Sequence, residues 1–344
     1  MMRAAVLERH GGPDVLRVVD LVKPVPERGE VLVEVSTCGL NHGLDGRTRA
    51  NGAGRIIAFP LVLGSEIAGR VVEVGPDIPD EWLRWKVLIT PWKAEFSGSG
   101  EYLPQERHKS FLLRGVHFNG GNAEYVVAKP AELIRLPDEA DLIEAAALPV
   151  SYSTAAHMLE RAALTEGETV LVLGAAGTVG IAAIQLAKAV GARVVAAAST
   201  LEKRSAARRL GADFAVDYTS PDWLGDVMSL TGGRGVDVVI EHIGKATWSS
   251  SLTSLAMGGR VAMCGASSGH QLEFDARPLW RKNASIVFVN SGSDSSLRRV
   301  VSLWCEGALK PVIAGGFALD DVSRAHEMLS RRDTIGKVIL KVKA

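Results

Sequence analysis

The sequence predicts an α/β protein of two domains, a β-rich domain followed by a parallel sheet with crossover helices. At 344 residues the chain is too long for one ordinary hydrophobic core and suits two. Residues 29–41, "GEVLVEVSTCGLN", alternate their side chains with the period of a half-buried strand. Beyond residue 141, short Val and Ile runs alternate with helical stretches, which is the pattern of βαβ units.

The N-terminal part contains further short β-rich runs at 65–75, 85–90 and 121–137, separated by Gly and Pro. Such runs favour a small barrel or sandwich. Residues 93–118 are polar with weak periodicity, and we expect a surface lobe or lid there.

The C-terminal part begins with an Ala-rich helical stretch at 141–164. Its closing segment, 320–344, reads as a helix and then a strand that returns to the first domain. We expect a catalytic domain over 1–128, completed by 296–344, and a cofactor domain over 129–295. The predicted strands of the cofactor domain are 169–173, 192–198, 213–217, 236–241, 260–265 and 285–290.

Composition excludes several function classes. Apolar residues make up 47% and charged residues 23%, and 39 basic residues balance 39 acidic ones. This balance indicates no nucleic-acid or anionic-membrane partner. The N-terminus has no apolar signal segment and the apolar runs are too short to span a membrane, so we expect a cytoplasmic protein. Three distant cysteines predict reduced thiols.

The most specific motif is "TVLVLGAAGTVGIAAIQLAKAVGARVV", residues 169–195. An apolar strand runs into a glycine turn and an amphipathic helix, and Ala176 stands where the usual second glycine falls. Glycines let the backbone approach a pyrophosphate, and the helix N-terminus offers N–H groups to it. The sequence therefore predicts a dinucleotide site, whose candidate contacts are Gly174, Ala176, Gly177, Thr178, Val179 and Gly180.

The end of the next strand selects the dinucleotide. An NAD site needs a carboxylate there for the ribose 2′-hydroxyl, but this chain has Ala198. Ser199, Thr200, Lys203 and Arg204 follow, and hydroxyls with cations suit a 2′-phosphate. The prediction is NADP(H).

With these residues in view, the chain resembles the medium-chain dehydrogenase/reductase superfamily over nearly its whole length. The supporting blocks include "LGSEIAGRVVEVG", "AAALPVSYSTAAHML", "LGADFAVDY", "TGGRGVDVVIEHIG", "SLAMGGRVAMCG" and "GKVIL". The resemblance implies a GroES-like β-rich catalytic domain and a Rossmann, doubly wound, parallel-sheet cofactor domain. It also implies a homodimer paired through the last strand of the Rossmann sheet, here near 285–290.

The same resemblance implies further cofactor contacts. Thr154 would lie beside the nicotinamide and Tyr218 near the adenosine phosphate. Gly244 and Gly265 would face the cofactor from strand ends, and Lys337, in the closing "GKVIL", is also expected to contact it.

Metal binding is not expected. In the zinc-dependent branch, ligands stand at the positions of Asn41 and Ser65; only Glu66 remains acidic here, and Cys38 falls three residues early, as a strand residue. The lobe at 93–118 contains no cysteine, so a structural site there would need His108, His117 and carboxylates.

The chain instead resembles the zinc-free quinone oxidoreductase and alkene reductase branch. There "N-x-x-D" follows the strand; here "NHGLD" is one residue longer, and "GRTRA" stands where some relatives have cleft tyrosines. The expected activity is NADPH-dependent reduction of an enone or quinone. Asn41 would donate to the developing oxyanion, His42 or water would supply the proton, and Asp45 completes the candidate catalytic set.

Two alternatives remain open. The protein would be an alcohol or carbonyl dehydrogenase of the zinc-type branch, or a non-catalytic NADPH-binding protein of the same fold. His42 has both a structural and a functional reading.

Overall fold

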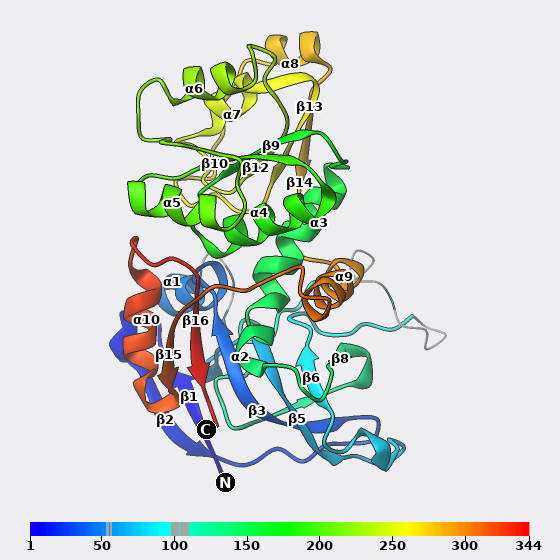
Figure 1. Ribbon diagram of the computed structural model, residues 1–344. Coiled ribbons are helices and arrows are strands. Elements are labelled where there is room, and N and C mark those ends of the chain that lie inside the picture. The colour runs from blue at the N-terminus through cyan, green and yellow to red at the C-terminus, as the bar shows by residue number, and fades with distance from the viewer. Residues whose placement is uncertain (53–54, 56, 98–102, 104–109, 344) are drawn as a thin grey trace. The chain divides into compact units, whose positions relative to one another are not determined.

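The computed structural model describes residues 1–52, 55, 57–97, 103 and 110–343. It divides into two compact units (Figure 1). The first unit contains Met1–Val150, Ser293–Cys305 and Pro311–Ala344, and the second contains Ser151–Gly292 and Glu306–Lys310.

The first unit is β-rich, as predicted. A three-stranded sheet has the order β2-β1-β4, and a larger sheet has the order β15-β16-β3-β5-β6-β8, with β7 also paired to β3. The return of the C-terminal segment is confirmed, because β16 pairs antiparallel with β3. The strands are β1 (Met2–Leu7), β2 (Leu16–Leu21), β3 (Val31–Leu40), β4 (Leu61–Val62), β5 (Glu66–Val74), β6 (Lys86–Ile89), β7 (Tyr125–Ala128), β8 (Leu133–Arg135), β15 (Ile313–Ala318) and β16 (Lys337–Lys341).

The alternation of β3 explains its position. Val31, Val33 and Val35 are fully buried and belong to one core cluster, which side chains of β5 and β6 complete. Helix α10 (Val322–Ser330) closes this core with Val322 and Ala325. The unit's other α-helices are α1 (Arg47–Asn51), α2 (Leu142–Ala145) and α9 (Asp294–Cys305).

The second unit is a doubly wound parallel sheet of order β11-β10-β9-β12-β13-β14. Helices α3, α4 and α5 lie on one side of it and α6, α7 and α8 on the other (Figure 1). The strands are β9 (Thr169–Leu173), β10 (Arg193–Ala197), β11 (Phe214–Val216), β12 (Val236–Glu241), β13 (Leu255–Met263) and β14 (Ser285–Phe288). The helices are α3 (Ser153–Arg161), α4 (Thr178–Val190), α5 (Leu201–Arg209), α6 (Trp223–Leu230), α7 (Trp248–Thr253) and α8 (Arg277–Lys282).

The predicted domain boundaries differ from this division at residues 129–150 and 293–295, which belong to the first unit. Strand β8 extends the first unit's sheet by pairing with β6, and α2 packs on β3 and β5. Glu306–Lys310 joins the second unit, because Gln185 donates to the Lys310 carbonyl (2.9 Å) and accepts from the Lys310 N–H (2.7 Å).

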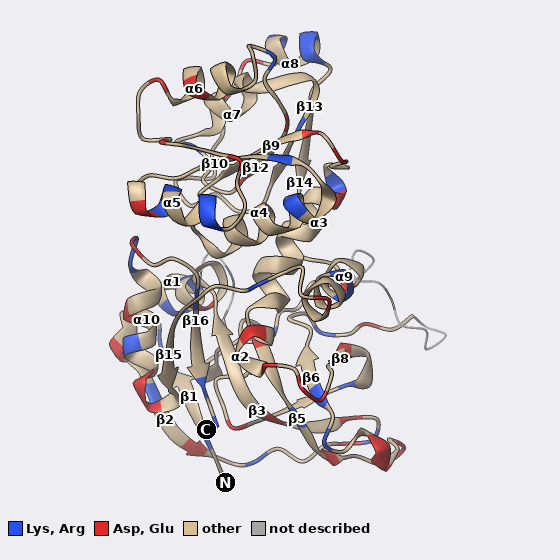
Figure 2. Cartoon of the chain, in the orientation of Figure 1, with Lys and Arg blue, Asp and Glu red and all other residues tan. Residues whose placement is uncertain are grey.

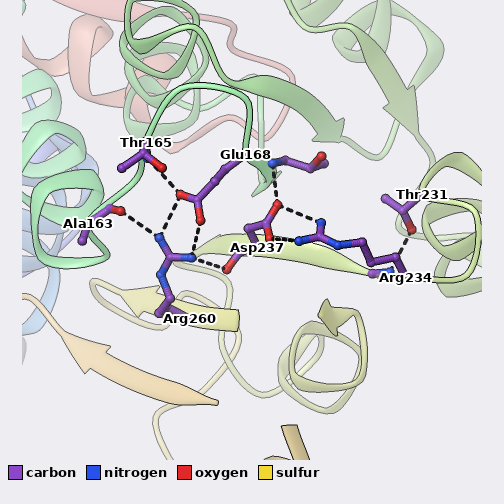
Figure 3. A network of polar contacts seen from close by, with 9 residues as sticks. Ala163, Thr165, Glu168, Thr231, Arg234, Asp237 and Arg260 are labelled. Atoms are coloured by element: carbon purple, nitrogen blue, oxygen red, sulfur yellow. Dashed lines mark hydrogen bonds and ion pairs between the residues drawn. The ribbon is translucent and has the colours of Figure 1, made fainter. Parts of the chain in front are cut away.

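A polar network holds the amino-terminal edge of the parallel sheet (Figure 3). Arg260 makes a two-pronged ion pair with Glu168 at 2.7 and 2.9 Å and also donates to the carbonyl of Ala163. Asp237 accepts from the Thr169 N–H and from Arg234. These bonds tie Arg260 of β13 to the beginnings of β9 and β12, at the end of the sheet opposite the glycine turn.

The lobe predicted at 93–118 lies partly outside the described residues, as does His108. Its described part is anchored by a bridge between Trp92 and Leu113 and by a buried ion pair between Arg114 and Glu132, 2.8 Å apart. In the described parts of the chain, none of the helices has both the length and the apolar character needed to cross a membrane.

Candidate functional site

The predicted cofactor residues of the second unit follow the carboxyl ends of its parallel strands. Gly174 follows β9, Ser199 follows β10, Tyr218 follows β11, Gly244 follows β12 and Gly265 follows β13. Because all these strands are parallel, their carboxyl ends lie along one edge of the sheet. Strand order reverses between β9 and β12, which is where doubly wound sheets bind ligands.

The glycine turn has the geometry that a dinucleotide loop needs. Gly174 has a φ of +57°, a conformation that disfavours a side chain. A Cβ on Gly180 would lie 2.5 Å from the Gly174 carbonyl oxygen and 2.7 Å from the Ala175 Cα, so only glycine lets α4 begin this close to the strand. Gly177 caps α4 without a side chain, which leaves the N–H groups of the first turn, at Thr178 and Val179, for a ligand. Ala176 is buried in the turn.

The residues predicted for the 2′-phosphate begin α5. Thr200 caps this helix by accepting from the Lys203 N–H at 3.3 Å. Arg204 is already paired: it lies 2.7 Å from a carboxylate oxygen of Asp217 and donates to the Ala198 carbonyl at 3.3 Å. A carboxylate, that of Asp217 after β11, thus lies beside the helix that follows β10.

The sequence reasoning missed Glu241 at the end of β12. Its buried carboxylate accepts from the N–H groups of Ile243 (2.7 Å) and Gly244 (3.1 Å) and from the hydroxyls of Thr247 and Ser251. It therefore fixes the loop that carries Gly244, whose φ is +90°. An acidic residue ending the apolar run "VDVVIE" was the available signal.

His242, next in the chain, contacts the glycine turn. Its Cε1 lies 2.7 Å from where a Cβ of Gly174 would stand. Burial lowers the pKa of His242, which keeps its ring neutral. Its aromatic ring thus packs against the glycine turn at Gly174.

Three other predicted cofactor residues have distinct surroundings. Thr154 is buried in α3, and Tyr218 packs against the core of the second unit. Lys337 belongs to the first unit, where its buried ammonium pairs with Glu66, the first residue of β5. Its contact with a cofactor stays a prediction.

The extra residue of "NHGLD" is accommodated by a π-helical turn over His42–Gly46. The Gly46 N–H donates to the Asn41 carbonyl at 3.1 Å, a bond five residues long. The Asn41 side-chain oxygen accepts from the N–H groups of Gly43 (2.8 Å) and Leu44 (3.1 Å). Since these contacts use the oxygen end of the amide, its nitrogen end remains the donor that can face a ligand.

Asp45 holds this turn in place. Its buried carboxylate accepts from the Asn41 N–H at 2.7 Å and from the Gly64 N–H at 2.9 Å. It thereby ties the end of β3 to the segment before β5. The structure gives Asp45 a positioning role toward Asn41, and a direct contact with substrate is not expected of a side chain so enclosed.

The ionisation of Asp45 is unfavourable in the fold. Burial raises its pKa to about 6, the negative charge of Glu66 adds to the rise, and the bonds from Asn41 and Gly64 oppose it. Between pH 3.8 and about 6, the folded protein therefore binds more protons than the unfolded chain at this site, and its stability falls as the pH rises.

We expect Asp45→Asn to remove this pH dependence. The free energy of unfolding of the wild type, minus that of the variant, should decrease as the pH rises from 3.8 to about 6. Urea unfolding of both proteins across this range measures it. A difference that stays constant with pH would show that Asp45 ionises alike in the folded and unfolded states.

The residues at the zinc-ligand positions do not fit a metal. Asn41 uses its oxygen to cap the turn, and Ser65 donates its hydroxyl to the Arg114 carbonyl. Glu66 pairs with Lys337 and accepts from the Val150 N–H at 2.8 Å. Among the described residues, no three His, Cys, Asp or Glu side chains are grouped as metal ligands would be.

Cys38 is a strand residue, as expected from its position. Its side chain is buried in the core of the first unit. Burial raises the pKa of the Cys38 thiol well above its ordinary value, and the charges of Asp45 and Glu66 raise it further. The thiol is therefore neutral and a poor metal ligand.

His42 lies on the exposed side of the turn. Partial burial lowers the pKa of His42, and the charges of Arg47 and Arg49 lower it further. Its ring is therefore neutral at pH 7 and would act as a proton donor only through a neutral imidazole or a bound water.

The two units define a class of oxidoreductase in which a β-rich domain accompanies a nicotinamide-dinucleotide domain. A family model described as the alcohol dehydrogenase GroES-like domain matches residues 27–138, and one described as zinc-binding dehydrogenase matches residues 178–305. Human quinone oxidoreductase is 28% identical over 349 residues, covering 99% of this chain and 98% of the relative. Acryloyl-coenzyme A reductase from Metallosphaera sedula is 30% identical over 352 residues, covering 98% of this chain and 99% of the relative.

A crystal structure of an NAD-dependent alcohol dehydrogenase has a TM-score of 0.92 and 37% identity, covering 99% of this chain and 100% of that one. The chain belongs to the medium-chain dehydrogenase/reductase superfamily, in its quinone oxidoreductase-like branch. The predicted GroES-like and Rossmann domains are confirmed. The protein is an oxidoreductase of a family that binds a nicotinamide dinucleotide.

Proposed function

We propose that this protein is an NADPH-dependent, metal-independent reductase of an activated C=C bond, as in an enone, or of a quinone. The observation that carries the proposal is the orientation of Asn41, whose amide oxygen is engaged by its own turn and whose nitrogen is left to donate. A bound nicotinamide cofactor supplies the hydride.

The first unit supplies the electrostatic part of the reaction. As negative charge grows on the carbonyl or quinone oxygen, an N–H of Asn41 donates to it. Asp45 holds Asn41 by its backbone, so that the donor is positioned before the substrate arrives. A proton then reaches the product from His42 or from water.

The preference for NADPH rests on Ser199 and Lys203 at the beginning of α5. Arg204 contributes less than the sequence indicated, because Asp217 already pairs with it. An NAD-dependent alcohol dehydrogenase is the second candidate, because Asp217 offers the carboxylate that a ribose 2′-hydroxyl would use and because the similar crystal structure bears that name.

Replacing Lys203 by alanine is expected to weaken NADPH binding roughly tenfold or more, since a charge-assisted bond contributes about 1.5–3 kcal/mol. NADH binding should hardly change. Fluorescence titration of both cofactors measures the effect, with Arg209→Ala as the control, because Arg209 is an exposed cation at the far end of the same helix. Equal losses for NADPH and NADH would place Lys203 away from the 2′-phosphate.

Substrate activation tests the proposed reaction. Enones and quinones carry their own activation and should oxidise NADPH. Simple ketones should not oxidise NADPH and primary alcohols should not reduce NADP⁺, because both reactions need a Lewis acid. Activity should persist in a strong chelator, with no stoichiometric zinc by elemental analysis. Turnover confined to unactivated aldehydes or alcohols, and lost on chelation, would establish the zinc-type alternative.

We also propose a homodimer paired through β14. This strand is at the edge of its sheet, and Phe288 on it is 65% exposed. Trp280 and Met257, of α8 and β13, are also exposed large apolar side chains. An unpaired strand edge beside exposed apolar side chains favours strand pairing between two copies. A cytoplasmic location stays a prediction.

A further inference from the structure

Two arginine side chains of the first unit have no partner in the described part of the chain. Arg47 begins α1, directly after the turn that carries Asn41, and Arg55 follows α1. Both are half-buried, yet neither side chain makes a hydrogen bond or ion pair with a described residue. The Nη1 atom of Arg55 is buried without any acceptor. A buried, unpartnered guanidinium nitrogen is costly, and such a group calls for an explanation.

Arg49, between them, serves as a contrast. It donates from Nε to the Nδ1 of His326 at 3.2 Å and from Nη1 to the Gly11 carbonyl. Its guanidinium is therefore committed to holding α1 against α10. The lack of partners at Arg47 and Arg55 is thus not a general property of arginines in this segment.

These two cations and two imidazoles share one electrostatic neighbourhood. Burial is the larger cause of the lowered pKa values of Arg55, His42 and His117. The charge of Arg47 lowers the pKa of Arg55 and of His42 further, and the charge of Arg55 lowers the pKa of His117 further. The neighbourhood thus joins the turn after β3 to the described part of the lobe. It lies beside the proposed donor Asn41, which precedes His42 in the chain.

This neighbourhood offers donors and few acceptors. The Nδ1 of His117 accepts the Leu113 N–H at 2.9 Å, so the neutral ring carries its proton on Nε2 and can donate it. Asp45, the acid closest in sequence, uses both oxygens on backbone N–H groups. Among the described residues, no acid is therefore paired with these two guanidinium groups, although Lys and Arg are interspersed with Asp and Glu over both units (Figure 2) and the chain is neutral overall.

We propose that the substrate carries an anionic group, a carboxylate or a phosphate, and that Arg47 and Arg55 bind it, with His117 as a further donor. The planar guanidinium matches the paired oxygens of both groups. This inference rests on the proposed function and narrows it: the reducible C=C belongs to an acid or a phosphate-bearing compound. It also accounts for "GRTRA", where some relatives have cleft tyrosines.

Paired probes that differ in charge test the inference. β-Acetylacrylate and its methyl ester form the carboxylate pair; crotonyl-coenzyme A and the crotonyl thioester of N-acetylcysteamine form the phosphate pair. With saturating NADPH, kcat/KM should favour the anion of one pair by about 10- to 100-fold, the effect of one charge-assisted contact. The preferred pair identifies the anion. Salt should reduce the preference, because it screens partly exposed charges.

Arg55→Gln and Arg47→Gln should each reduce the anion-to-neutral ratio by about tenfold or more. Arg47→Lys, which keeps the charge, should retain part of the ratio. Arg17→Gln is the matched control, since Arg17 is an exposed arginine on β2. Equal kcat/KM for anion and neutral probe in the wild type, or ratios unchanged in both Gln variants, would overturn the inference.

If no probe is turned over, the proposed reaction fails but the inference can still be decided. Calorimetry with levulinate, the saturated analogue of β-acetylacrylate, and with butyryl-coenzyme A measures anion binding without chemistry. Salt-sensitive binding of either compound that Arg55→Gln abolishes would support the anion site. Absence of binding by both in the wild type would exclude it.

Discussion

Asn41→Ala is expected to lower kcat by about 10²–10³, the usual cost of removing one preorganised donor to a developing oxyanion. NADPH affinity should hold, because no cofactor role is proposed for this side chain. Stopped-flow measurement of NADPH oxidation with an enone at saturating cofactor gives the rate of the chemical step. A loss of less than about threefold would remove Asn41 from the reaction, since a preorganised donor contributes far more.

The same substitution also removes a cap. Asn41 accepts from two N–H groups of the π-helical turn, and loss of such a cap costs about 0.5–2 kcal/mol of stability. Asn41→Ser separates the two roles, because serine caps about as well as asparagine but has no amide nitrogen. Stability should recover in Asn41→Ser while kcat remains low. Recovery of both would show that only the cap matters.

Gly180→Ala is expected to abolish most dinucleotide affinity. Its Cβ would meet two backbone atoms, the Gly174 oxygen at 2.5 Å and the Ala175 Cα at 2.7 Å, neither of which can rotate away. The glycine turn and the first turn of α4 must therefore separate, which displaces the N–H groups proposed for the pyrophosphate. Overpacking of this kind costs about 1–3 kcal/mol, more than the roughly 1 kcal/mol that alanine gains over glycine in a helix.

Gly177→Ala is the matched comparison, three residues earlier in the chain. There the added Cβ would lie 3.3 Å from the Gly174 oxygen, and the φ of −74° suits any residue. Melting temperature should fall in Gly180→Ala and hardly change in Gly177→Ala, and NADPH titration should show the larger loss in Gly180→Ala. Undiminished NADPH affinity in Gly180→Ala would mean that the pyrophosphate does not use this turn.

Local patterns were sufficient for most of the fold. The alternation of Val31, Val33 and Val35 predicted a strand because the period of side chains along a strand is two. The glycine turn could be predicted because the positive φ at Gly174 and the close contacts at Gly180, which both require glycine, arise within seven consecutive residues. The order of strands and helices implied a parallel sheet, and parallel strands bring their carboxyl ends to one edge.

What the sequence by itself determined is therefore the two-domain α/β architecture, the family and the edge of the sheet that carries the cofactor residues. Tertiary structure decided which side chains were already engaged. Arg204 of α5 meets Asp217 after β11, Asp45 turns inward to Gly64, and Lys337 pairs with Glu66 from the far end of the chain. Such partners are distant in sequence and become neighbours only when strands and helices pack together, so no local pattern predicts them. The side chains of Arg47 and Arg55 have no partner among the described residues, and that distinction between engaged and available charges exists only in the folded molecule.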